Sequence, residues 1–185
     1  MKTNTNSVSY RVALGGIVSA LCLLSMFLAG VMPMFYVLLP MVAGAMMMII
    51  VIEVSWQWAF ITYIAVGLLS MFVCFDKEAA ILFIVLFGHY PILKYLIDNK
   101  LSSKKIAWFV KFLIYNFCMV SYFLICVYIL GSKELLKEIQ KYFWWIILLI
   151  DFLFLTYDPS LDTLTEKYTE LIKPKLQGKR KRGRR

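Results

Sequence analysis

The chain has 185 residues, of which 62% are hydrophobic, and a formal net charge of +9. Soluble domains are about 45–50% apolar, so a chain of this size cannot hide this much apolar surface without lipid. The net charge says little about the body of the protein, because residues 173–185 alone hold eight lysines and arginines and no acid. We therefore expect an all-α integral membrane protein with a basic tail.

Six apolar segments recur along the chain, most of them close to the roughly 20 residues that cross about 30 Å of hydrocarbon. They cover about 12–30, 33–52, 56–75, 79–96, 106–130 and 142–157, and the last is the shortest. The pattern predicts a six-transmembrane-helix bundle over residues 1–158. A short surface helix, or an extension of a neighbouring helix, is expected over 132–141.

A cytoplasmic amphipathic helix and a polybasic tail are predicted over residues 159–185. Ser160 fits the position of a helix cap after Asp158 and Pro159. A single apolar stripe follows it, formed by Leu161, Leu164, Tyr168, Leu171 and Ile172.

The distribution of lysine and arginine predicts the orientation in the membrane. With the N-terminus inside, sixteen of these residues fall on the cytoplasmic side and four outside. An even number of spans then returns the tail to the same side. We expect a multi-pass protein of the cell membrane with both termini cytoplasmic, whose tail binds anionic lipid rather than a specific nucleic acid.

Four ionisable residues fall near the predicted inner face of the membrane, and two arrangements of their side chains are possible. Glu53 forms an ion-pair cluster with Lys94 or Lys111, or the lysines extend to the lipid headgroups. His89 belongs to the same predicted polar cluster and precedes Pro91, which is expected to kink the fourth helix.

Two polar residues lie deeper in the spans, and they are the leading candidates for binding a solute. An unpaired Asp151 in hydrocarbon is costly, so we expect it to meet Asn116, a hydroxyl or water. That contact is either a structural hydrogen bond between helices or part of a ligand site. Tyr36, Asp76 and Trp144 at the predicted outer edge are further candidates.

The first helix carries a stripe of small residues formed by Ala13, Gly16 and Ala20. Small residues at this spacing let another helix approach closely, either within this bundle or from a partner.

Enzymatic function is not expected. The chain lacks the glycine-rich loop of nucleotide hydrolases and the motifs of zinc proteases and serine hydrolases. It holds a single histidine, so we expect no metal site and no cofactor. The four cysteines are expected to be small buried hydrophobes.

Three stretches carry a family resemblance: YRVALGGIVSA at 10–20, DKEAA at 76–80 and FGHYPILK at 87–94. Over residues 8–157 the chain resembles the substrate-binding S components of energy-coupling factor (ECF) transporters, or bacterial membrane proteins related to them. The resemblance implies that Gly16 and Ala20, with Ala13, dock onto a transmembrane coupling subunit. Many S components have a longer loop that caps the ligand after the first helix, whereas here Val31 and Met32 alone form this connection.

By this resemblance the chain is a transport subunit that binds a micronutrient or vitamin-like solute for ATP-driven uptake, with a coupling subunit and two ATPases as partners. One alternative is a non-catalytic scaffold or assembly protein that acts through its polybasic tail. Another is a membrane enzyme that uses Glu53, His89 and Asp151.

Overall fold

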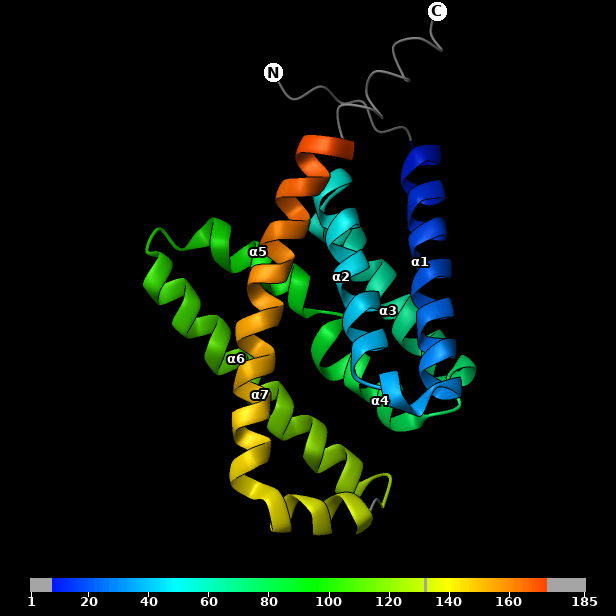
Figure 1. The fold of residues 1–185 in the computed structure, drawn as a ribbon. Helices are drawn as coiled ribbons and strands as arrows, with labels where there is room; N and C mark the ends of the chain where they lie inside the picture. The colour runs from blue at the N-terminus through cyan, green and yellow to red at the C-terminus, as the bar shows by residue number, and fades with distance from the viewer. Residues whose placement is uncertain (1–7, 132, 173–185) are drawn as a thin grey trace, which may run out of the picture.

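The computed structural model describes residues 8–131 and 133–172, which are helical with short connections and contain no strand. Helix α1 spans Val8–Val31, α2 spans Leu38–Glu53 and α3 spans Trp56–Val73. A 3-10 turn at Pro33–Phe35 links the first two. The three helices pack beside one another, and consecutive helices run antiparallel (Figure 1).

The second half of the described chain folds against this three-helix unit. A continuous helical stretch comprises α4 (Lys77–Leu82), the π-helical turn η2 (Phe83–Phe87) and α5 (Tyr90–Lys100). Helices α6 (Lys104–Tyr128) and α7 (Lys133–Lys167) follow, and α7 ends in the π-helical turn η3 (Tyr168–Ile172). The start of α1 and the end of α7 lie at one end of the bundle, which we call the terminal end (Figure 1).

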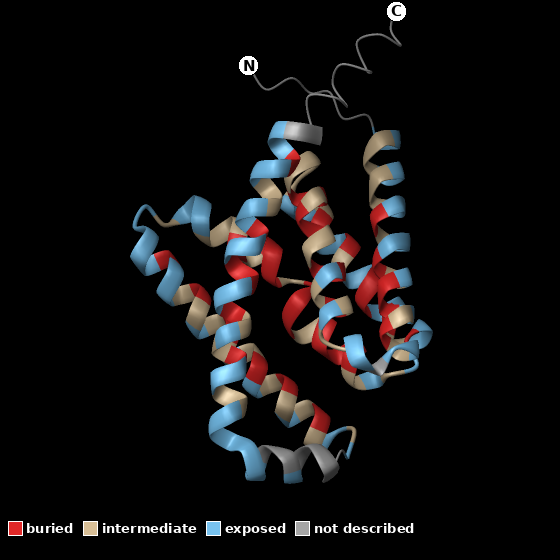
Figure 2. Cartoon of the chain, in the orientation of Figure 1, coloured by how far each residue is buried: buried red, intermediate tan, exposed pale blue. Residues whose placement is uncertain are grey.

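Five helical stretches of the described chain are long and apolar enough to cross a membrane. They are Val8–Val31, Trp56–Val73, Lys77–Lys100, Lys104–Tyr128 and Gln140–Glu170. Helix α2 is also apolar but has only 16 residues. Buried positions face the interior, while large apolar side chains such as Phe72 and Phe117 are exposed on the outer faces (Figure 2). The predicted all-helical bundle is confirmed, and its helices suit a membrane.

Charged side chains fix the turn between α3 and α4. Asp76 caps α4, because its Oδ1 accepts hydrogen bonds from the backbone N–H groups of Glu78 at 2.9 Å and Ala79 at 3.4 Å. Lys77 Nζ donates to carbonyls at the end of α3, those of Met71 at 2.6 Å and of the C-cap residue Cys74 at 3.0 Å.

Helices α2 and η2 approach each other at the level of the backbone. A Cβ atom at Gly44 would overlap the carbonyl group of Phe87, so glycine is required there. The neighbouring π-turn frees carbonyl groups from the regular α-helical pattern. The Ile84 carbonyl then accepts a hydrogen bond from Tyr63 Oη at 2.7 Å.

Helix α7 differs from its prediction. It runs unbroken through Pro159, so the predicted boundary between residues 158 and 159 falls inside a helix. Ser160 is not a cap, because its Oγ donates to the Thr156 carbonyl at 2.6 Å in the middle of the helix. Proline removes only one backbone hydrogen bond here, and packing on both sides of it holds the helix together.

The two segments that flank the predicted sixth span are also parts of α7. The helix expected over 132–141 forms its first stretch, which bends at Tyr142 (φ −118°, ψ 27°). The predicted apolar stripe packs on the bundle, with Leu161 and Tyr168 buried and Leu164 against the core. The side chains of Leu171 and Ile172 and the whole tail at 173–185 lie outside the described residues.

Candidate functional site

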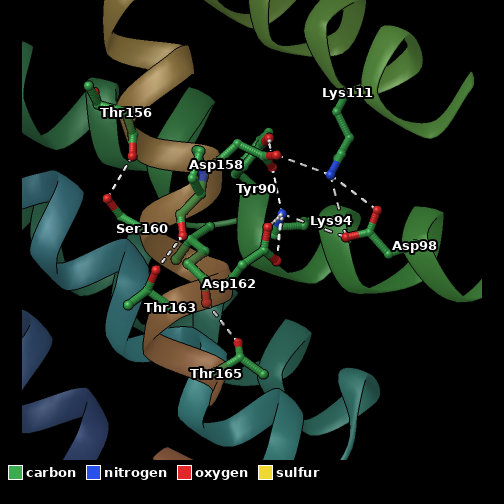
Figure 3. A network of polar contacts seen from close by, with 12 residues as sticks. Tyr90, Lys94, Asp98, Lys111, Thr156, Asp158, Ser160, Asp162, Thr163 and Thr165 are labelled. Atoms are coloured by element: carbon green, nitrogen blue, oxygen red, sulfur yellow. Dashed lines mark hydrogen bonds and ion pairs between the residues drawn. The ribbon is translucent and has the colours of Figure 1, made fainter. Parts of the chain in front are cut away.

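A buried ionic network joins α5, α6 and α7 (Figure 3). Lys94 on α5 is 1% exposed, and its Nζ lies 2.8 Å from Asp158 Oδ1 and 3.0 Å from Asp162 Oδ1. Asp98, one turn further along α5, is 3.6 Å from the same nitrogen. The single ammonium group of Lys94 is therefore surrounded by three carboxylates.

Asp158 is the centre of this network. Its Oδ2 lies 3.1 Å from Lys111 Nζ on α6, and its Oδ1 accepts a hydrogen bond from Tyr90 Oη at 2.7 Å. Lys111 also contacts Asp98 Oδ1 at 3.1 Å. Asp158 thus ties two lysines and a tyrosine on two other helices to α7.

We call these six residues the ionic clamp: Tyr90, Lys94, Asp98, Lys111, Asp158 and Asp162. Removing charges from water is costly, and only good geometry with every donor engaged offsets this cost. Lys94, Lys111 and Asp158 are all buried, whereas Asp98 and Asp162 are partly open to the surroundings. The clamp is therefore well suited to holding α5, α6 and α7 together.

An aromatic layer lies directly beside the clamp. The Tyr90 ring is 6.0 Å from that of Tyr115 on α6 and 5.5 Å from that of Tyr157 on α7. The ring of Phe154 on α7 packs against two of them, 5.2 Å from that of Tyr115 and 6.4 Å from that of Tyr90. This layer continues the clamp along the interface of α6 and α7, away from the terminal end.

Three polar atoms in and next to this layer are shielded from the surroundings and lack a hydrogen-bond partner. They are Tyr115 Oη, Tyr157 Oη and Asp151 Oδ1. Tyr115 and Tyr157 are almost completely buried, and the Asp151 carboxylate lies within electrostatic range of the Tyr115 hydroxyl. Because each buried polar group without a partner costs about 1–3 kcal/mol, this grouping is a candidate site for a polar ligand. We call Tyr115, Asp151 and Tyr157 the unpaired trio.

The spacing of residues on α6 places its polar side chains in the interior. Lys111, Tyr115, Met119, Tyr122 and Cys126 recur every three or four positions and are all buried. The residues between them, such as Phe117 and Leu124, are exposed. A membrane helix of this kind directs polar groups toward its neighbours and apolar ones toward lipid.

The structure separates the two leading candidates for solute binding. Asn116 Nδ2 donates to the Phe112 carbonyl of its own helix at 3.1 Å, so its amide is used locally. Asp151 lies close to the hydroxyl of Tyr115 rather than hydrogen-bonding with Asn116. Of the two, Asp151 remains a candidate with a free acceptor.

The weaker candidates do not join this site as a group. Asp76 caps α4, and Trp144 on α7 is 76% exposed. Tyr36 lies in the connection between α1 and α2, where it is partly buried and packs against both halves of the core.

Two of the four residues of the predicted inner cluster come together, namely Lys94 and Lys111. Their partners are aspartates rather than Glu53. Glu53 Oε2 accepts a hydrogen bond from Tyr10 Oη at 3.2 Å, which links α2 to α1 near the terminal end. The expected ion pair of Glu53 with Lys94 or Lys111 does not form, because both lysines pair with aspartates instead.

His89 occupies a separate place between η2 and α5. Its Nδ1 lies 3.3 Å from the Ile84 carbonyl, and its Nε2 lies 3.5 Å from Cys118 Sγ. It lines an apolar groove of about 510 Å³ between α3 and α5, with Trp56 and Phe60 on the opposite wall. Among the described residues no group of three potential metal ligands occurs, and His89 is not part of one.

The small-residue stripe of α1 points away from the bundle. Ala13, Gly16 and Ala20 are all exposed, and a Cβ at Gly16 would meet nothing within 4 Å. The stripe is thus not used for packing within the described chain.

The importance of Asp158, Asp162 and Asp98 was not evident from the sequence. Asp158 was interpreted with Pro159 as the end of a span. One signal was present: Asp158 and Asp162 are four residues apart, as are Lys94 and Asp98, and this spacing places each pair on one face of a helix.

Comparisons of the chain with protein-family models, with curated proteins and with solved structures gave no match.

Proposed function

We propose that the chain is a membrane transport subunit of the S-component kind, which binds a small solute within its bundle for ATP-driven uptake. In this proposal it spans the cell membrane six times with both termini in the cytoplasm. A coupling subunit and two ATPases are its partners, and its basic tail binds anionic lipid.

The observation that carries the proposal is the unpaired trio. Three polar atoms without partners lie inside a bundle whose helices suit a membrane, and Tyr115 is within electrostatic range of both Asp151 and Tyr157. In hydrocarbon, water does not satisfy such groups cheaply, and polar residues inside membrane bundles mark pathways for solutes and ions. A bound solute supplies the missing hydrogen bonds.

The ionic clamp also supports the proposal of a solute site at the trio. Both lysines of the clamp pair with Asp158, so neither is free to pair with a group at the trio. It also fixes α6 and α7, the two helices that carry the trio, in one relative position. A binding site needs such a rigid support.

The exposed stripe on α1 supports the docking of a partner. Side chains larger than alanine would keep a second helix away, and Gly16 leaves the backbone open to close approach. In contrast to Gly44, nothing within the described chain requires a glycine at position 16.

The test is to purify the full chain from its native membrane in mild detergent and to identify bound proteins and small molecules by mass spectrometry. We expect a coupling subunit, two ATPases and one solute. A Gly16→Leu variant should lose the proteins and keep the solute. Leu21→Phe is the matched control, because it also changes an exposed position of α1 but lies about 140° around the helix.

Recovery of the wild-type chain alone, without partner or solute, would contradict the proposal. Recovery of other proteins that depend on residues 173–185 and not on Gly16 would favour the scaffold alternative instead.

A further inference from the structure

The chemistry around Asp151 narrows the class of solute. Asp151 is the only charged residue between Tyr142 and Tyr157, and on the facing helix no charged residue follows Lys111 up to Tyr128. The trio therefore has a carboxylate and two hydroxyls but no basic group of its own. The two lysines that are buried in the described chain, Lys94 and Lys111, are engaged by the aspartates of the clamp.

A carboxylate in this position lacks a counter-charge. Among the described residues no ion pair involves Asp151, and its Oδ1 is shielded without a hydrogen-bond donor. Burying an uncompensated charge costs far more than burying a neutral polar group, so a cation is the natural complement. An anionic solute would be repelled by the Asp151 carboxylate, which already lacks a counter-charge.

The surrounding rings distinguish an organic cation from a metal ion. Tyr115 lies within electrostatic range of the Asp151 carboxylate, and its ring centroid is 5.2 Å from that of Phe154. Aromatic faces attract ammonium groups, whereas Ca²⁺ and Mg²⁺ prefer several oxygen ligands. The trio offers a single carboxylate, so it is a poor cage for a metal.

We infer that the trio binds an organic amine whose cationic nitrogen donates to Asp151, with the aromatic ring of Tyr115 beside it. The inference rests on the proposed function, since it names the class of solute for the same site. The tyrosine hydroxyls bind polar groups on the rest of the molecule.

The test is thermal unfolding of the purified full chain in detergent with four named probes. Putrescine and choline are the cations, succinate is the anion and erythritol is the neutral polyol. A ligand that binds only the folded state raises Tm as its concentration rises. We expect this rise with at least one of the two amines and with neither succinate nor erythritol.

Asp151→Asn should raise the apparent Kd for the amine about tenfold or more, as loss of one charged hydrogen bond implies. Tyr115→Phe should weaken binding less. The matched controls are Glu166→Gln, an exposed carboxylate on the same helix, and Tyr128→Phe, an exposed tyrosine on α6. Both should bind as the wild type does.

Stabilisation by succinate or erythritol alone, an unchanged amine Kd in Asp151→Asn, or no response to either amine would overturn the inference. The proposed function is tested by different outcomes. If the purified chain carries a neutral or anionic solute that Asp151→Asn and Tyr115→Phe release, the function stands and the amine class falls. If it carries no solute and no partner, the function itself falls.

Discussion

Lys94 and Asp158 are 64 residues apart in the sequence, yet Lys94 Nζ donates to Asp158 Oδ1 at 2.8 Å in the buried interior. This contact ties α5 to α7. It also explains why α7 continues through Pro159, because the residue before the proline is anchored from outside its own helix.

The first prediction concerns this anchor. Lys94→Met leaves Asp158 without its shortest cationic contact and should lower the free energy of unfolding by about 3–5 kcal/mol, the usual cost of removing one partner of a buried ion pair. Reversible unfolding in mixed micelles measures it. Lys100→Met, an exposed position of the same helix, should change stability little; equal effects of the two variants would contradict the clamp.

A second prediction compares two glycines. Gly44→Ala forces the new Cβ into the Phe87 carbonyl and should destabilise the bundle by about 1–3 kcal/mol or more. Gly16→Ala meets open space and should leave the unfolding transition unchanged or slightly raised. Similar Tm values for both variants in detergent would show that α2 and η2 do not pack as closely as described.

Pro159 provides a third prediction. Because α7 is helical on both sides of this residue, Pro159→Ala restores a backbone N–H to a helix that already exists. We expect Tm to rise, since proline in a helix interior costs about 3 kcal/mol relative to alanine. A fall in Tm would indicate that the proline marks the start of a separate element, as the sequence predicted.

Two neighbouring tyrosines of the aromatic layer, Tyr90 and Tyr115, yield a fourth prediction, in which the same substitution has opposite effects. Tyr90→Phe removes the hydrogen bond to Asp158 and should destabilise the solute-free chain by about 1.5–3 kcal/mol. Tyr115→Phe removes a hydroxyl without a partner and should be neutral or stabilising. The measurement is Tm without added solute, and a comparable loss in both variants would show that the Tyr115 hydroxyl is satisfied.

The helices from Val8 to Tyr128 could be predicted because long apolar runs dominate their sequence. The extent of α7 could not be predicted. Asp158 and Pro159 together indicate the end of a helix, but contacts of Asp158 with α5 and α6 keep the helix continuous. Asp151 could be identified as a candidate from the sequence alone, because a single acidic residue within an apolar segment is unusual.

The surroundings of Asp151 could not be predicted in the same way. Tyr115 and Tyr157 come from different helices, and tyrosine is common in membrane segments for many reasons. Which hydroxyls face the interior depends on how α6 and α7 pack. The aspartate partners of Lys94 were missed for the same reason. Glu53 was expected as its partner instead, because Glu53 and Lys94 fall near the same predicted membrane face.

The most direct test of the solute site is the amount of small molecule that copurifies with the full chain in mild detergent, measured by mass spectrometry for the wild type and for Asp151→Asn. Glu166→Gln serves as the control on the same helix. We predict one solute bound to the wild type and to Glu166→Gln, and at least about tenfold less bound to Asp151→Asn. Equal amounts in all three proteins, or none in the wild type, would contradict the presence of a solute site at Asp151.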